Sequence, residues 1–490
     1  MPNSIWAWHL YQVLPNIGIA SIAGNIDEDF EVDVADLVLV RANFRSFLEN
    51  RITKHAPDII GLSAMSFSAK TALYIAKFIK HLDPKIQIVI GGYHATTMGE
   101  EITQSESLNL DFIIRGEGES TFNELLAAIE YNKDLNEIKG LSFKKKEKFV
   151  HNPRRKLEDL TTLKLPRRSA RILTKGFHSM GLKADVVESS RGCVNNCDFC
   201  SMTYMYGRNF RKYTIERVLD DIEECKKGGV KAIMFADDNI TLDSKHLALL
   251  CEGIIERNLN KIHYIVQASV KGLYDKPELL KKIVEANFKL IFLGIENPNP
   301  KILRSIGKNV RNQAEKSKSI ISYLRSQKVL AAGGFILGSP DDTKEDFLNV
   351  VKFVKKIKID MPIFQFLTPF PKTTIRERLL ETNLVFNTDD YSNYDTLTPN
   401  VKTHHLTREE IIILRERMWD EFLTPDWFVT NGINIARLYP WHSLKTVLRS
   451  GPRLLKKTLN RMTRAKSEYE IADEILQEEK DFRDLKRFTW

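Results

Sequence analysis

The strongest constraint on the fold of this chain is a repeated alternation of strand-like apolar runs with helical patterns. Six such runs lie between about 183 and 385, and a helical pattern follows each of the first five. They are residues 185–189, 232–236, 264–268, 290–295, 332–337 and 363–367. Helices that return the chain to the same edge of a sheet produce parallel strands. The spacing therefore predicts a partial barrel of six parallel strands, incomplete relative to the eight-stranded form.

The first 140 or so residues show the same alternation. Strand-like runs at 58–63, 87–92 and 111–119 are separated by helical patterns, of which 69–82 is the clearest. This order predicts a doubly wound parallel sheet, and in such sheets ligands bind beyond the carboxyl ends of the strands. Small residues stand at those ends and would let a ligand approach the backbone closely. They are Ser63, Gly91, Gly92 and residues 116–118.

The 490 residues are too many for one compact core, so several domains are expected. Residues 1–140 form the first predicted domain, and residues 181–385 form the barrel. The basic stretch 141–180 lacks sustained periodicity and is interpreted as a linker. Residues 386–490 have a helical pattern, with a helix predicted over 407–422 after a Thr-x-x-Glu capping signal.

Three of the five cysteines are crowded together just after the first barrel strand. Cys193, Cys197 and Cys200 have the spacing Cys-x3-Cys-x2-Cys, whereas Cys225 and Cys251 stand alone in helical patterns. Thiolates are soft ligands suited to iron–sulfur clusters, and three of them leave one iron of a four-iron cluster open. The main alternative is structural zinc, which takes four protein ligands. No fourth cysteine or nearby histidine follows at a suitable spacing.

The cysteine segment resembles the cluster loop of the radical S-adenosylmethionine superfamily, whose pattern is Cys-x3-Cys-x-aromatic-Cys, with Phe199 at the aromatic position. The resemblance implies a 4Fe–4S cluster whose open iron is chelated by S-adenosylmethionine. It further implies a 5′-deoxyadenosyl radical that abstracts hydrogen from an unactivated carbon. An external electron donor, such as ferredoxin or flavodoxin, is implied as well.

The same resemblance extends to later strand ends, over about 180–375. Asp237 and Asp238 stand where many members have Gly-Gly-Glu, which holds the methionine amino group. Gln267 falls where members place contacts to the ribose or carboxylate, and Glu296 ends a Gly-x-Glu sequence. Segment 334–340 resembles the Gly-x-Ile-x-Gly segment along the adenine. The residues thereby assigned to S-adenosylmethionine are Phe199, Asp237, Asp238, Gln267, Glu296, Ile336 and Gly338.

The first domain resembles the cobalamin-binding domain fused to many radical enzymes, through segments 57–63, 91–95 and 115–119. The chain lacks the Asp-x-His-x-x-Gly motif by which methionine-synthase-type domains supply a histidine to cobalt. Many members of this subclass also lack it, and some relatives with the domain bind no cobalamin. The residues that the resemblance places at the cobalamin are Ser63, Gly91, Gly92, His94, Gly116 and Glu117.

With cobalamin bound, the resemblance favours methylation of an unactivated carbon. Without it, the substrate radical would cyclise or couple instead. The subclass includes hopanoid methylases, the anaerobic magnesium-protoporphyrin ester cyclase and archaeal lipid-modifying enzymes. A transfer-RNA-modifying radical enzyme is a further alternative, but the chain has no cysteine before Cys193 for a second cluster. A non-catalytic cobalamin or iron–sulfur sensor is another.

The segment 441–466 interleaves apolar residues with eight lysines and arginines, and it holds no acidic residue. The pattern is typical of amphipathic helices that lie in a membrane interface. It suggests peripheral contact with the inner face of a membrane and a lipid or other membrane-resident substrate. A solvated helix face packed on the barrel is the alternative. Neither a secretory signal nor a membrane span is evident, so we expect a cytoplasmic protein with a small-molecule or lipid substrate and no nucleic-acid partner.

Overall fold

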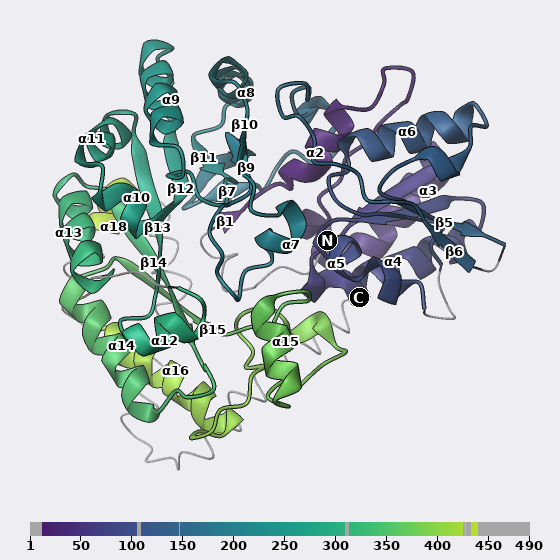
Figure 1. Cartoon of the computed structure of the whole chain (residues 1–490). Helices are drawn as coiled ribbons and strands as arrows, with labels where there is room; N and C mark the ends of the chain where they lie inside the picture. Colours follow the sequence, from purple (N-terminus) through teal and green to yellow (C-terminus); the bar gives the residue numbers. More distant parts are fainter. Residues whose placement is uncertain are drawn as a thin grey trace.

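The computed structural model describes residues 12–104, 109–146, 148–308, 313–424, 427 and 433–439. The basic segment 441–466 lies outside these residues. Within them, no helix combines the length and the apolar character needed to cross a membrane. The described chain contains a large sheet of eight strands, a sheet of five strands and a two-stranded ribbon. Figure 1 shows the large curved sheet on one side of the molecule and the five-stranded sheet on the other.

Six neighbouring strands of the large sheet are parallel and form the predicted partial barrel. They are β8 (Leu182–Val187), β11 (Ala232–Phe235), β12 (His263–Ser269), β13 (Phe288–Glu296), β14 (Leu330–Leu337) and β15 (Met361–Phe366). All six predicted strands are thereby confirmed, as is the α/β fold class. Two antiparallel edge strands, β1 (Gln12–Val13) and β7 (His178–Ser179), extend the sheet. Strands of two residues are too short to leave a period in the sequence.

Helices cover the outer face of this sheet (Figure 1). They are α8 (Ile215–Lys227), α9 (Ser244–Glu256), α10 (Val270–Tyr274), α11 (Pro277–Glu285), α13 (Gln313–Ser326), α14 (Lys344–Ile357) and α16 (Arg408–Phe422). The predicted capping signal is confirmed at α16, where Thr407 and Glu410 form a capping box. Such a cap contributes about 1 kcal/mol to the stability of a helix.

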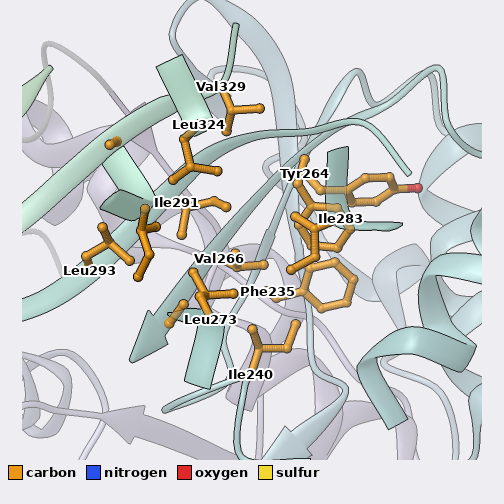
Figure 2. Packing of buried hydrophobic residues seen from close by; sticks show 14 of the residues in the cluster. Phe235, Ile240, Tyr264, Val266, Leu273, Ile283, Ile291, Leu293, Leu324 and Val329 are labelled. Carbon is orange, nitrogen blue, oxygen red and sulfur yellow. The ribbon is translucent and has the colours of Figure 1, made fainter. Parts of the chain in front are cut away.

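The main hydrophobic core lies between the sheet and these helices (Figure 2). Phe235 and Phe288, on β11 and β13, stack with ring centroids 6.0 Å apart, and Tyr264 of β12 packs against both. The Tyr264 hydroxyl donates to the Leu259 carbonyl at 3.1 Å, which satisfies its buried polar atom. Burying each aromatic side chain contributes about 1.5–3 kcal/mol. Along each barrel strand, alternate side chains point outward into this core, and the side chains between them point to the concave face.

The smaller sheet has three parallel strands, β2 (Ile59–Ser63), β3 (Gln87–Gly91) and β4 (Phe112–Ile114). Its helices are α2 (Ile17–Gly24), α3 (Phe44–His55), α4 (Ala69–Leu82), α5 (Tyr93–Ile102) and α6 (Glu119–Glu130). The helix predicted over 69–82 is confirmed with the same bounds. An antiparallel hairpin, β5 (Leu141–Lys145) and β6 (Lys148–His151), pairs onto β4. Part of the predicted linker is thus an extension of the sheet.

The two sheets are bridged where their strands end. The chain beyond β15 reaches the first domain, where Lys372 pairs with Glu101 at 2.7 Å and Asp390 pairs with Lys70 at 2.9 Å. In Figure 1, α7 (Met202–Tyr206) and α15 (Thr374–Glu381) lie between the barrel and the smaller sheet. The ligand-binding ends predicted for the two sheets therefore face a shared region.

Candidate active site

The three clustered cysteines lie in a loop between β9 (Ser190–Arg191) and α7. All three are partly buried, while residues 194–196 at the tip of the loop are exposed. The Cys200 amide donates to the Cys197 carbonyl at 3.0 Å, which closes a turn between the last two cysteines. Burial raises the pKa of all three thiols, to about 12 for Cys200, and the neighbouring thiols add to the increase at Cys197 and Cys200.

The three thiols suit an iron–sulfur cluster by their chemistry, because soft thiolates bind iron and each can bind a different iron of a cubane. Metal binding requires the thiolate form. The Lys308 ammonium favours that form at Cys193 and Cys197, opposing the effect of burial on their pKa.

Two aspartates at the end of β11 fix the start of the cluster loop. Asp237 is fully buried, and its carboxylate accepts hydrogen bonds from the Ser189 amide at 3.0 Å, the Ser189 hydroxyl at 2.6 Å and the Ser190 hydroxyl. Asp238 accepts from the Gly192 amide at 2.9 Å. Asp237 was predicted to contact S-adenosylmethionine, but its oxygens are occupied by the chain that precedes the cluster. We therefore propose that Asp237 positions the loop and that Asp238 remains the candidate contact.

The other predicted S-adenosylmethionine residues of the barrel lie on or beside its concave face. Gln267, Glu296 and Ile336 alternate with strand residues that enter the outer core. Phe199 of the cluster loop packs in the same apolar cluster as Ile336. The Gln267 side chain has no hydrogen bond to any described residue. The arrangement thus leaves apolar and polar side chains from separate strands beside the cysteine loop.

Lys308 is a site residue that the sequence analysis missed. Its ammonium lies 2.7 Å from the Glu296 carboxylate and 3.0 Å from the Gly294 carbonyl, at a bulge where β13 ends. Glu296 has a backbone φ of +66°, a left-handed conformation that is uncommon outside glycine. No motif marks Lys308, which follows the short helix α12 (Pro300–Ser305).

Gly338 begins the turn after β14 and is held by Asp342. The Gly338 and Ser339 amides both donate to the same Asp342 oxygen, at 2.8 and 3.1 Å. The second oxygen, Oδ1, is buried without a partner in the described structure. Burial raises the pKa of Asp342 to about 7, so folding shifts this carboxyl toward its protonated form.

Replacing Asp342 with asparagine is expected to stabilise the protein at pH 8. The wild-type contribution is fully present below the unfolded pKa of 3.8 and is lost as the pH rises toward the folded value of about 7. Asparagine keeps the oxygen that accepts both amides and never ionises. The thermal midpoint of D342N should exceed that of wild type at pH 8, with about half the difference remaining at pH 5.5. A difference that is independent of pH would contradict this assignment.

Backbone geometry at the ends of β2, β3 and β4 suits close approach of a large ligand. Ser63 pairs with Gly91 in the parallel register. Gly92 has φ +90°, and a Cβ there would lie 2.9 Å from the Ala64 carbonyl oxygen, so only glycine fits. Gly116 has φ +94°, and a Cβ there would meet nothing within 4 Å. The strand ends predicted to bind cobalamin are therefore formed by partly buried backbone, with open space beside Gly116 where a side chain would lie.

His94 opens α5 next to these glycines and is buried. Burial lowers its pKa to about 4, so the ring is neutral at physiological pH. The ring packs edge-on against Tyr391 at 5.3 Å, and its Nδ1 has no partner among the described residues. A neutral imidazole with an unsatisfied nitrogen fits a polar ligand group at this edge of the sheet.

Glu117 was predicted to contact cobalamin, but in the structure its carboxylate forms ion pairs with two arginines. Its carboxylate pairs with Arg191 at 3.0 Å and with Arg211 at 2.8 Å, and it also accepts from the Glu158 amide at 2.8 Å. Both arginines belong to the barrel side, on the two-stranded ribbon that carries the cluster loop. The carboxylate therefore connects the two halves of the molecule.

A cysteine-bearing loop at the mouth of a partial barrel, facing a sheet of the cobalamin-binding type, defines the class of the protein. Residues 187–354 match the radical S-adenosylmethionine superfamily, and residues 5–126 match the B12 binding domain. The chain belongs to the radical S-adenosylmethionine superfamily, in the branch with a cobalamin-binding domain. The family prediction is thereby confirmed.

Specific relatives support the same assignment. The chain is 31% identical over 431 residues to an uncharacterized methyltransferase of Pyrococcus horikoshii, covering 86% of this chain and 92% of the relative. It is 27% identical to the anaerobic magnesium-protoporphyrin IX monomethyl ester cyclase of Cereibacter sphaeroides, over 74% and 60% of the two chains. The fold resembles that of TsrM, a radical S-adenosylmethionine methyltransferase of Kitasatospora setae solved with cobalamin and a 4Fe–4S cluster. The TM-score is 0.67 at 18% identity, over 79% and 78% of the chains.

The protein is therefore a cobalamin-dependent radical enzyme, either a methyltransferase or a related cyclase. When bound, the cluster and S-adenosylmethionine would together supply a radical able to remove hydrogen from the substrate. The three cysteines would hold the cluster. Asp238, Gln267 and Glu296 would orient S-adenosylmethionine from the strand ends. The concave barrel face and the chain after β15 would exclude water from the reacting atoms.

Proposed function

We propose that the enzyme methylates an unactivated carbon of a small substrate held between the barrel and the first domain. The observation that carries this proposal is a direct contact between the two cofactor-binding regions. The Tyr93 hydroxyl, one residue beyond Gly92, lies 2.8 Å from the Met202 sulfur, two residues beyond Cys200. A methyl donor at the glycine ends of the first sheet would then adjoin the site of radical formation. The match to a methyltransferase over most of both chains supports the same reaction.

Isotope transfer tests this proposal. The reconstituted holoenzyme, with hydroxocobalamin and a strong reductant, is incubated with S-adenosylmethionine carrying a deuterated methyl group and an extract of cells that lack the gene. We expect one extract component to gain a deuterated methyl group, as measured by mass spectrometry. Formation of 5′-deoxyadenosine together with an unlabelled product would reject methylation.

A second candidate is radical cyclisation or carbon–carbon coupling without methyl transfer. The specific observation in its favour is the match to the magnesium-protoporphyrin ester cyclase of Cereibacter sphaeroides. The same experiment distinguishes the two reactions, because a cyclised product loses hydrogen and carries no label. An external one-electron donor is required for either reaction.

We also propose that the substrate is a lipid or another membrane-resident molecule, on the basis of the basic segment 441–466. Each lysine or arginine near an anionic membrane contributes about 1 kcal/mol, so eight of them would hold the protein there reversibly. The full-length protein should float with liposomes that contain anionic lipid and remain at the bottom of the gradient with neutral ones. Deletion of 442–466 should abolish flotation. Unchanged flotation after the deletion would overturn the proposal.

A further inference from the structure

A buried ion cluster joins the two halves of the enzyme at the point where each begins its cofactor loop. The Arg191 guanidinium lies 3.0 Å from Glu117, 2.7 Å from Glu119 and 2.9 Å from Glu188. The Arg191 side chain is 7% exposed, and those of Glu117 and Glu119 are 6% and 4% exposed. Buried charges of this kind are strongly coupled, because removing one leaves the others without a counter-charge.

On the first-domain side, the cluster is continuous with the predicted cobalamin loop. Glu117 and Glu119 lie one and three residues beyond Gly116, whose amide donates to the Thr96 hydroxyl at 3.0 Å. Glu119 is also the first residue of α6 and accepts from the Ser21 hydroxyl of α2 at 2.7 Å. A shift of the loop at Gly116 would therefore be transmitted to both carboxylates.

On the barrel side, the connection from Arg191 to the cluster loop is short and sterically constrained. Only Gly192 separates Arg191 from Cys193. The Gly192 amide donates to Asp238 at 2.9 Å, and a Cβ on Gly192 would lie 2.2 Å from the Asn209 carbonyl oxygen. The ribbon of β9 with β10 (Arg211–Lys212) fixes the other side, with Arg191 opposite Arg211. Movement of the Arg191 side chain would thus reach Cys193 and Asp238 directly.

We propose that Arg191 is a positioning residue that couples the cobalamin loop to the cluster loop, so that each cofactor site strengthens binding at the other. A displacement of the Glu117 and Glu119 carboxylates, which belong to the first domain, would move Arg191 and with it the cysteine loop. Coupling of this kind is reciprocal: cobalamin must raise the affinity for S-adenosylmethionine by the same factor as S-adenosylmethionine raises the affinity for cobalamin. The inference does not depend on whether the product is methylated or cyclised.

The test measures two dissociation constants in the cluster-loaded protein. Binding of S-adenosylmethionine is measured with and without hydroxocobalamin, and binding of hydroxocobalamin with and without S-adenosylmethionine. In wild type, each ligand should tighten the other by about 5- to 150-fold, the usual range of allosteric coupling. E119Q keeps the shape of the side chain but removes its charge. In this variant the ratio of the dissociation constants without and with the other ligand, the coupling factor, should fall toward one.

The matched control is E124Q, on the same helix. Glu124 also pairs with an arginine, but it is half-exposed, and that partner, Arg155, lies outside the ribbon that carries the cluster loop. E124Q should retain the wild-type factor. In electron paramagnetic resonance, the g values of the reduced cluster with S-adenosylmethionine, read apart from the separate signal of cob(II)alamin, should change on addition of hydroxocobalamin in wild type and E124Q, and not in E119Q.

Arg191→Lys provides a second variant if E119Q folds poorly. Lysine keeps the charge but cannot span three carboxylates as a guanidinium does, so its factor should lie between those of wild type and E119Q. A wild-type factor of one, or equal factors in wild type and in the variants of Glu119 and Arg191, would overturn the proposal.

Discussion

The variant Cys197→Ala is expected to form no 5′-deoxyadenosine above the background of the assay. Loss of one of three thiolates leaves the cluster with two protein ligands, and the open iron that chelates S-adenosylmethionine is lost with it. Iron and sulfide content and the visible absorbance of the cluster should fall together. The partial burial of Cys197 beside the other two thiols is the structural basis for this expectation.

Cys225→Ala is the matched control for that experiment. Cys225 is 1% exposed and belongs to the hydrophobic core between α8 and the sheet. Truncation of a buried side chain by one atom costs about 1 kcal/mol, which leaves the fold intact. This variant should keep its cluster and its activity. Equal loss in the two variants, or cluster retention in Cys197→Ala, would contradict the assignment of the ligands.

Gly192→Ala should also deprive the enzyme of its cluster, although no ligand is changed. Gly192 has φ +91°, and its Cβ would lie 2.2 Å from the backbone oxygen of Asn209, which no side-chain rotation can relieve. The backbone conformation alone costs about 1–3 kcal/mol for a residue other than glycine. The ribbon must open to admit the methyl group, and Cys193 moves with it. Cluster content and formation of 5′-deoxyadenosine should fall at least about tenfold.

Gly229→Ala separates the steric clash from backbone strain. Gly229 has φ +76° in the turn after α8, and a Cβ there would meet nothing within 4 Å. An alanine there would carry backbone strain of the same kind, but the position lies far from the cysteine loop in the sequence. The variant should lose some thermal stability and keep its full cluster content. Similar cluster loss in both variants would show that the close approach at Asn209 is not the cause.

Most of the fold could be predicted because its signals are local. Each barrel strand is a short apolar run followed by a helical pattern, and all six lie where the pattern places them. The helix at 69–82 and the capping box at Thr407 were equally local. The edge strands β1 and β7 and the hairpin β5–β6 were missed, because short or polar strands acquire their structure from the partner against which they pair.

The candidate site also has features that the sequence predicts and features that depend on the tertiary structure. The spacing of Cys193, Cys197 and Cys200 predicts the chemistry of the site, since three thiolates would leave one iron of a four-iron cluster open. The roles of the acidic residues depend on their neighbours. Asp237 and Asp238 are adjacent in the sequence, yet Asp237 is enclosed by Ser189 and Ser190 while Asp238 contacts the cluster loop at Gly192.

The sequence by itself determined the parallel strands, the clustering of the three cysteines and the resemblance of two domains to known families, because these rest on residue type and spacing. Only the tertiary structure decided that Glu117 and Glu119 meet Arg191, more than 70 positions away in the sequence, and that Lys308 meets Glu296 beside the cysteines. The physical reason is that an ion pair depends on where two side chains are brought by the packing of separate elements. No local sequence pattern specifies the distance between two side chains on separate elements.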